Sequence, residues 1–238
     1  IEVKRRFGDA RRSEITENVA ELDIEDLIPD EDAVITLTRG GYIKRTPMAT
    51  YRSQRRGGVG VQGMTTTAED LIEHLYIATT HSTVLFFTSL GRVYPLKAYE
   101  IPEAGRNAKG SAMPNLITLE KEEIVTAIIP VREFVEEENL FMATRGGVVK
   151  QTSLANFAKV RRTGIIAINL DEGDSLIGVK RIEKEDNIFM ATRNGLAIQF
   201  KADTIRELGR TARGVRGIKL RVGDEVVAMD AVKSEETE

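Results

Sequence analysis

Four copies of one pattern, each about 50 residues long, run through most of this 238-residue sequence. Each copy begins with a nearly continuous apolar run that ends in threonine, and these runs are residues 34–38, 84–88, 140–144 and 188–192. Such runs, rich in β-branched and aromatic residues, are typical of strands buried on both faces. Three residues after each threonine comes a glycine, at Gly41, Gly91, Gly147 and Gly195. Because glycine tolerates positive φ angles, the pattern predicts a tight hairpin after each strand.

The second half of each copy is as regular as the first. A second strand, such as residues 42–45 or 148–150, leads into a longer loop that closes on a second glycine. The two glycines of a copy lie 19, 19, 17 and 19 residues apart, the second ones being Gly60, Gly110, Gly164 and Gly214. A third strand, such as 165–170 or 215–220, then an acidic turn and a fourth apolar strand complete the copy. Four strands in a ~50-residue unit indicate a propeller blade, so we predict an all-β, propeller-like domain.

The predicted domain covers residues 33–238, with repeats at about 33–81, 82–137, 138–185 and 186–238. Residues 1–16 hold five basic side chains, and residues 17–32 hold eight acidic ones. We interpret 1–32 as a linker or the tail of a preceding domain, followed by a solvated acidic segment. Because the chain opens on Ile1, we expect it to be a piece of a longer polypeptide.

Charge follows the repeat. The hairpin and long loop of each copy (39–60, 91–110, 145–164 and 193–214) carry net charges of +6, +2, +5 and +3, which leaves −19 for the rest of a chain whose total is −3. If equivalent loops of successive blades lie side by side, their basic residues form a positive track along one edge. A polyanion backbone would follow such a track, with an affinity that falls steeply as salt is added.

The most basic of these loops contains Gln54-Arg55-Arg56-Gly57-Gly58-Val59-Gly60. Three glycines among arginines favour an anion-binding loop, because glycine has no side chain to hold a phosphate away from the backbone. A merely solvated hairpin is the alternative explanation of so short a motif.

Several other classes of site lack their residues in this sequence. There is no cysteine, which excludes disulfides, thiolate zinc sites and cysteine nucleophiles and is compatible with the cytoplasm, where we expect the protein to act. No glycine-rich segment is followed by the Lys-Ser or Lys-Thr of a nucleotide-binding loop, and no catalytic triad or carboxylate pair stands in a recognisable frame. We therefore expect no cofactor, no metal and no membrane span.

Residues 54–60 resemble the seven-residue box in the C-terminal domain of bacterial DNA gyrase A, which consists of a glutamine, two basic residues, two glycines, a basic residue and a glycine. Degenerate copies stand at 105–110 (Gly-Arg-Asn-Ala-Lys-Gly) and 209–214 (Gly-Arg-Thr-Ala-Arg-Gly), where later blades of that family carry theirs. The resemblance covers essentially the whole chain. One departure is Val59, which replaces the last basic residue of the family box.

The resemblance implies a β-pinwheel, a propeller-like disc whose blades exchange strands and whose rim bends and wraps double-stranded DNA with a chosen handedness. It implies no catalysis in this chain. The DNA-cleaving tyrosine would belong to the preceding part of gyrase A, whereas the ATPase would belong to gyrase B, in an A2B2 holoenzyme that supercoils DNA. Relatives carry about six repeats, and four are visible here.

Basic residues near the second strand and in the long loop of each copy are the candidates for the DNA-binding rim. In addition to residues 54–60, they are Lys44, Arg45, Arg106, Lys109, Lys150, Arg161, Arg162, Arg210 and Arg213. Two alternatives stay open: the related domain of topoisomerase IV, which bends DNA without strong wrapping, and a propeller that docks an acidic protein. Pro95 cannot donate a ladder hydrogen bond, so the sequence predicts an edge or a bulge in the second strand of the second copy.

Overall fold

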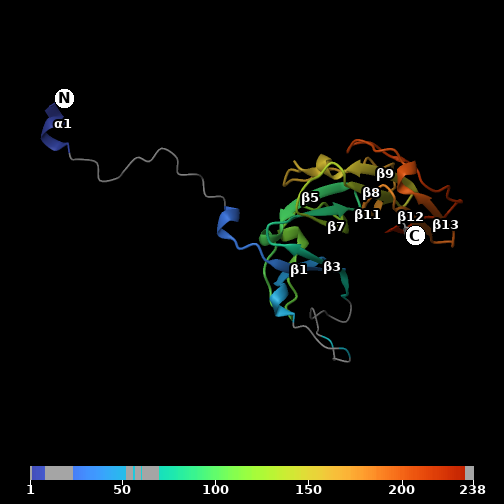
Figure 1. Ribbon diagram of the computed structural model, residues 1–238, viewed down its shortest axis with the longest axis horizontal. Coiled ribbons are helices and arrows are strands. Elements are labelled where there is room, and N and C mark those ends of the chain that lie inside the picture. The colour runs from blue at the N-terminus through green and yellow to red at the C-terminus, as the bar shows by residue number, and fades with distance from the viewer. Residues whose placement is uncertain (1, 9–23, 52–55, 57–59, 61–69, 234–238) are drawn as a thin grey trace.

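The structure, a computed structural model, describes residues 2–8, 24–51, 56, 60 and 70–233. These residues form four small antiparallel sheets, as the repeat predicts, and the all-β, propeller-like fold is confirmed. The sheets follow one another along the molecule (Figure 1), and strands β3, β7, β11 and β15 contact one another in that order. Short helices complete the described chain: α1 (Glu2–Phe7), η1 (Ile24–Leu27), η2 (Met48–Thr50), η3 (Ala98–Glu100), η4 (Met113–Asn115), η5 (Leu154–Phe157) and η6 (Ala202–Thr204).

The first two sheets have the same order of strands. In the first sheet the order is β3 (Ile72–Thr79), β1 (Asp32–Thr38), β2 (Tyr42–Pro47) and β6 (Ser111–Ala112). In the second sheet, β7 (Val125–Val131), β4 (Thr83–Thr88), β5 (Arg92–Lys97) and β10 (Ile165–Ile166) occupy the corresponding places.

The third sheet repeats this arrangement, and the fourth keeps three of its strands. The third consists of β11 (Leu176–Ile182), β8 (Asn139–Thr144), β9 (Val148–Ser153) and β14 (Val215–Arg216). The fourth consists of β15 (Val226–Val232), β12 (Asn187–Thr192) and β13 (Ala197–Lys201). Within the described residues, no strand pairs with the second side of β13.

The outermost strand of each complete sheet comes from the next repeat. Ile165 pairs with Val93, Val215 with Val149, and Ala112 with Tyr42, each in an antiparallel register. The exchange that the resemblance implied is therefore present, although the exchanged strands hold two residues each and are shorter than the sequence predicted. Consequently the long loop of each repeat from the second onward lies against the preceding blade.

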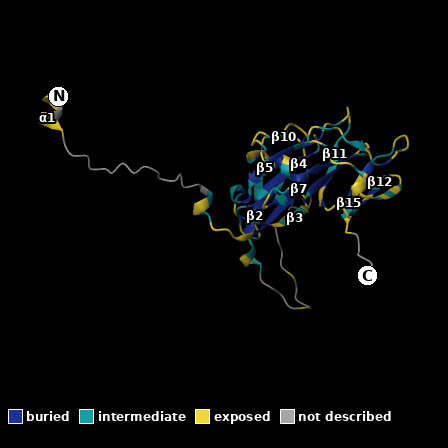
Figure 2. Ribbon diagram, turned by 45° about the horizontal axis from the view of Figure 1, so that its top comes forward, coloured by how far each residue is buried: buried dark blue, intermediate teal, exposed yellow. Residues whose placement is uncertain are grey.

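The central strands explain why the apolar runs are continuous. Along β4, Val84 and Phe86 pack toward the first sheet, whereas Leu85 and Phe87 pack toward the third. Because successive side chains of a strand point to opposite faces, a strand between two blades must be apolar at every position. The same alternation along β8 joins the second, third and fourth sheets. Figure 2 shows the buried residues concentrated in these strands.

Two local predictions need correction. The run 188–192 was expected to be buried on both faces, but Phe189 is 41% exposed because no further described blade covers that face of β12. Pro95 lies neither on the outermost strand nor at a bulge: β5 has neighbours on both sides. The outer neighbour, β10, pairs only with Arg92 and Val93, so the missing N–H of Pro95 breaks no pairing with it.

The acidic segment ahead of the first sheet contacts the second. Glu25, in η1, forms an ion pair with Lys97 at 2.8 Å, and Asp30 forms one with Arg132 at 3.2 Å. The Ile28 carbonyl oxygen lies 2.7 Å from Nε2 of His81. The described part of this segment is thus tied to the domain as well as solvated.

Candidate nucleic-acid interface

A basic groove lies between the long loops of the third and fourth repeats. Its volume is about 660 Å³. The residues that line it are Asn156, Lys159, Arg161, Thr163, Gly164, Ile165, Ile166, Arg210 and Thr211. Three of these are cationic and none is acidic, so the groove offers guanidinium, ammonium and hydroxyl donors without a competing carboxylate on its walls.

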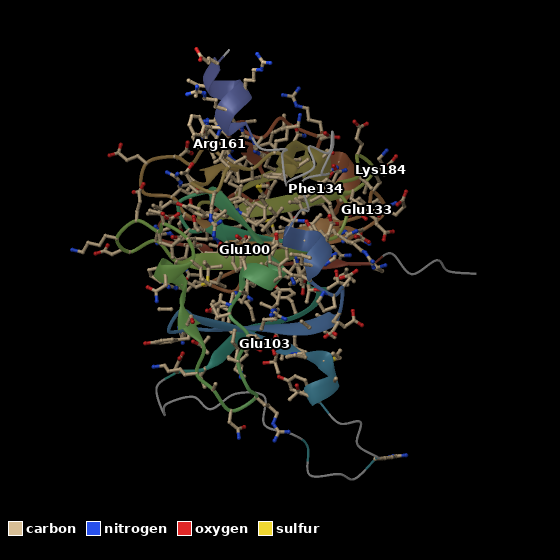
Figure 3. All side chains as sticks on the ribbon, turned by 90° about the vertical axis from the view of Figure 1, so that its left-hand side faces the viewer. Glu100, Glu103, Glu133, Phe134, Arg161 and Lys184 are labelled. Atoms are coloured by element: carbon tan, nitrogen blue, oxygen red, sulfur yellow. The ribbon has the colours of Figure 1, made fainter. Side chains whose placement is uncertain are left out.

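Strand exchange builds this groove. The loop of the third repeat ends at β10 on the second blade, and the loop of the fourth ends at β14 on the third blade. Arg210 reaches from the second loop to the first, where a guanidinium nitrogen donates to the carbonyl oxygen of Ile166. Lys159 and Arg161, on the loop of the third repeat, are exposed, and Figure 3 labels Arg161. Residues from two repeats therefore present their charges side by side.

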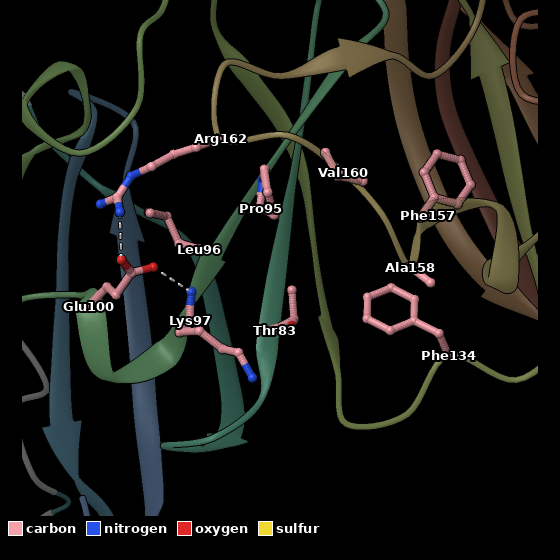
Figure 4. Close-up of a pocket in the computed structure, with 10 residues that line it drawn as sticks. All are labelled: Thr83, Pro95, Leu96, Lys97, Glu100, Phe134, Phe157, Ala158, Val160 and Arg162. Atoms are coloured by element: carbon pink, nitrogen blue, oxygen red, sulfur yellow. Dashed lines mark hydrogen bonds and ion pairs between the residues drawn. The ribbon is translucent and has the colours of Figure 1, made fainter. Parts of the chain in front are cut away.

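Two other candidates near the groove have carboxylate partners. Arg162 forms an ion pair with Glu100 at 2.9 Å, and the same carboxylate accepts a hydrogen bond from the backbone N–H of Lys97 (Figure 4). Arg213 forms an ion pair with Asp171. Both arginines are well exposed, with side-chain accessibilities of 70% and 64%, so their guanidinium groups remain within reach of a ligand. Exposed ion pairs of this kind are weak and do not lock a side chain.

The candidates of the first two repeats form a separate group. The Lys109 ammonium lies 3.8 Å from the centre of the Tyr42 ring, a cation–π arrangement that joins the second repeat to the first. Arg106, on the same loop, is half-buried. Arg45 forms an ion pair with Glu103 at 3.0 Å, and its side chain is only 14% exposed. Arg45 is thus a poorer candidate for ligand contact than Lys109.

Lys44 and Lys150 depart from the expectation that they lie on the rim. Both are completely buried, in β2 and β9. The Lys150 ammonium donates to the carbonyl oxygens of Ala167, Arg210 and Ala212, and the Lys44 ammonium donates to those of Gly105 and Arg106. Their charge is used inside the protein, so we remove both from the set of residues that contact a ligand.

Burial changes the acid–base behaviour of both lysines. Burial and the neighbouring Arg210 guanidinium lower the pKa of Lys150 from 10.5 to about 8, and burial also lowers the pKa of Lys44. An unfolded chain, in which Lys150 has its ordinary pKa, therefore binds more protons than the folded chain between pH 8 and 10.5. The contribution of Lys150 to stability accordingly rises as the pH rises through this window and is smallest below pH 8.

We expect the chain to gain up to about 2 kcal/mol of unfolding free energy relative to Lys150→Met between pH ~7.5 and ~9.5. Urea unfolding at the two pH values measures this difference. Lys184→Met, which removes an exposed ammonium, is the control and should follow the unsubstituted chain. Parallel pH profiles for the chain and Lys150→Met would show that Lys150 does not titrate in this range.

The predicted box lies mostly outside the described residues. Gln54, Arg55, Gly57, Gly58 and Val59 are not described, whereas Arg56 is exposed and Gly60 has a φ of +79°. The left-handed conformation of Gly60 recurs at Gly110, Gly164 and Gly214, the second glycines of the other repeats. The loop of the first repeat thus closes on the same backbone geometry as the others.

One residue of the groove was not singled out by the sequence. Lys159 was counted in the +5 charge of loop 145–164 but not named, although it lies two residues before Arg161. The signal that could have found it is the absence of any acidic residue between 145 and 164. Within the described residues, no group of three or more His, Asp or Glu side chains could hold a metal ion. No helix in the described ranges is long and apolar enough to span a bilayer.

Fold and charge together define a class: a propeller-like repeat protein with exchanged strands and a basic groove between the loops of two successive repeats. Comparison with known proteins identifies the family. The model of the DNA gyrase C-terminal domain, a beta-propeller, matches residues 32–79, 82–132, 138–183 and 186–233, and the chain belongs to this family.

Relatives and solved structures agree with this assignment. The chain is 48% identical to the DNA gyrase A protein of Salmonella typhimurium over 95% of its length and to that of Staphylococcus epidermidis over 98%. It spans 26% of the length of each. The C-terminal domain of DNA topoisomerase IV superposes with a TM-score of 0.76 at 26% identity, over 88% of this chain and 64% of that one. The DNA gyrase A C-terminal domain gives 0.65 at 26% identity, over 85% and 66%.

Proposed function

We propose that this chain binds, bends and wraps double-stranded DNA without catalysing a reaction itself. The observation that carries the proposal is the groove between the third and fourth repeats, where Lys159, Arg161 and Arg210 meet with no carboxylate among the lining residues. Cations spaced along such a surface would neutralise successive phosphates and release counterions, which supplies affinity independent of base sequence.

Curvature of the DNA follows from the placement of the basic loops on successive blades. A duplex that contacts the loops of several blades must bend to follow them, which costs on the order of 1–6 kcal/mol for a 40–90° bend of a short site. Added phosphate contacts with Lys109 and Arg213 would offset this cost. Arg55, Arg56 and the glycines around them would fix one end of the path, as the family box implies.

We further propose that this wrapping serves a DNA gyrase holoenzyme in the cytoplasm. The chain would lead DNA around gyrase A and present it, with a defined crossing, to the cleavage and ATPase machinery of an A2B2 assembly with gyrase B. Strand passage would then lower the linking number. This role is supported by the 48% identity to gyrase A proteins over nearly the whole chain.

Chiral wrapping is tested by ligating nicked circular DNA in the presence of the chain and reading the linking number after protein removal. We expect a shift toward positive linking number. Changing Arg55, Arg56, Gly57 and Gly58 together to alanine should abolish the shift while the far-ultraviolet circular dichroism stays unchanged. An undiminished shift in this variant would show that the box does not anchor the DNA.

A second candidate function is DNA bending without wrapping, the behaviour expected of a topoisomerase IV domain. It is favoured by the TM-score of 0.76 to that domain, which exceeds the 0.65 to the gyrase domain. Binding and bending of the duplex with no shift in linking number would support this candidate. Absence of DNA binding at moderate salt would instead favour a propeller that docks an acidic protein.

A further inference from the structure

A buried lysine of one blade binds the backbone of the basic loop donated by the next repeat, and this arrangement occurs twice. Lys44 is the third residue after Gly41, and Lys150 is the third residue after Gly147, so the two are equivalent. The loops they contact, 105–110 and 209–214, share the pattern Gly-Arg-x-Ala-basic-Gly. The sheets thus reproduce one lysine–loop pair in the first and third blades.

The two copies share one ammonium contact, to the carbonyl of the loop arginine, and differ in their other acceptors. The Lys44 ammonium lies 2.5 Å from the carbonyl oxygen of Arg106, and the Lys150 ammonium contacts the carbonyl oxygen of the equivalent Arg210. Lys44 also donates to Gly105, at 3.2 Å. Lys150 also donates to Ala212, at 3.4 Å, and to Ala167, at 2.6 Å. An ammonium has three N–H donors, and Lys150 thus has a carbonyl acceptor for each.

Neighbouring contacts fix the start of each loop in the same way. The N–H of Ala104 donates to the Arg45 carbonyl at 2.9 Å, and the N–H of Leu208 donates to that of Gln151 at 2.8 Å. The buried hydroxyls two residues beyond each lysine, those of Thr46 and Thr152, donate to the carbonyls of Ala104 and Leu208. The sequence Lys-x-Thr in the second strand is therefore the receptor for the incoming loop.

The second blade has no lysine at the equivalent position. Tyr94 stands at the equivalent position, and the loop it faces, 159–164, has no Gly-Arg-x-Ala-basic-Gly pattern. That loop packs on the Tyr94 ring instead: a Cβ added to Gly164 would lie 2.5 Å from a ring carbon. Arg92 donates to the Thr163 carbonyl at 3.1 Å. Lysine in the strand and the patterned loop in the next repeat thus occur together in this chain.

We propose that Lys44 and Lys150 are positioning residues, which hold loops 105–110 and 209–214 so that their basic side chains face the bound DNA. The carbonyls of Arg106 and Arg210 accept hydrogen bonds from a buried ammonium, which fixes the peptide plane next to each arginine. The functional part of this role rests on the proposed DNA binding. The structural part, loop fixation by the ammonium, is independent of DNA.

Lys150→Met tests the proposal, because methionine fills similar space without the ammonium. Hydrogen–deuterium exchange should become faster in 206–213 and stay unchanged in 125–131, which forms β7. The Kd for a duplex should rise about tenfold, as expected when one charged group no longer neutralises its phosphate. Lys184→Met removes an exposed lysine far along the sequence from the loops and should leave both exchange and Kd unchanged.

A double-mutant cycle separates positioning from a general structural role. If Lys150 acts through the loop, Lys150→Met should weaken binding little further once Arg210 and Arg213 are alanine. Independent, multiplying effects would overturn the proposal. If the two arginines prove irrelevant to affinity while exchange of 206–213 still accelerates, the proposed DNA surface fails and loop fixation stands.

Folding of the variants is itself informative. Loss of the native circular dichroism in Lys150→Met would make the ammonium a determinant of blade stability rather than of loop position, and would overturn the proposal for Lys150. Lys44→Met, measured in parallel, tests the positioning role for loop 105–110. Hydrogen–deuterium exchange of 103–109 should become faster in this variant. Unchanged exchange in that loop would overturn it there.

Discussion

Alanine at Lys159, Arg161 and Arg210 together is expected to weaken binding to a duplex by about 10²- to 10³-fold at ~0.1 M salt. This magnitude follows from counterion release, because each neutralised phosphate changes the slope of log K against log salt by about −0.9 and so contributes about eightfold at this concentration. The three side chains line one groove and are drawn from two repeats, so their removal would interrupt a continuous stretch of the DNA path. Fluorescence anisotropy with a labelled duplex, repeated over several salt concentrations, measures both the Kd and the slope.

The slope distinguishes direct contact from an indirect effect of the substitutions. We expect its magnitude to fall by about 3, roughly one for each phosphate that is no longer neutralised. The control removes the same net charge elsewhere, with alanine at the exposed Lys121, Lys184 and Lys233. Equal decreases in affinity for the two triple variants would mean that net charge, rather than the groove, sets the affinity.

Alanine at Gly214 is expected to destabilise the domain by about 3 kcal/mol or more. Two costs combine, since the φ of +103° is strained for alanine and its Cβ would lie 2.5 Å from the carbonyl oxygen of Val149. That oxygen belongs to β9, so relief of the contact would push the incoming strand β14 off the third sheet. The midpoint of urea unfolding reports the stability change.

Gly223→Ala separates the two costs. Gly223 has a φ of +78°, and a Cβ there would meet nothing within 4 Å. Only the backbone strain remains, about 1–2 kcal/mol. If Gly214→Ala and Gly223→Ala reduced stability equally, the close approach of the loop to β9 would be energetically unimportant, and strand exchange would tolerate a side chain at this position.

The repeat made most of the fold predictable. A strand that must pack against blades on both faces is apolar throughout, and a hairpin that needs a positive φ carries glycine, so both features appear in the local sequence. Gly41 and its three equivalents adopt φ angles between +71° and +84° as predicted. The exposed Phe189 was not predicted because burial of that face depends on a neighbouring blade, which local sequence does not encode.

The candidate site was less predictable because the position of a basic residue in the sequence does not show which group its side chain contacts. Lys44 stands next to Arg45 in the sequence, so it was predicted to belong to a basic surface. The carbonyl oxygens that accept hydrogen bonds from its ammonium lie 61 and 62 residues away. Arg162 likewise finds Glu100 in another repeat. The sequence revealed where positive charge accumulates, but not which charges are satisfied by groups within the protein.

Strand exchange also sets the order in which the domain can be completed during synthesis. The first sheet lacks its outermost strand until Ala112 has been made, well inside the second repeat, and the third lacks its own until Arg216. Each nascent blade therefore exposes an unpaired strand until part of its successor emerges from the ribosome, and such strands can pair wrongly. Pauses in translation before these strands emerge would prolong this exposure, whereas pauses after β6, β10 or β14 has left the ribosome would leave the preceding sheet closed.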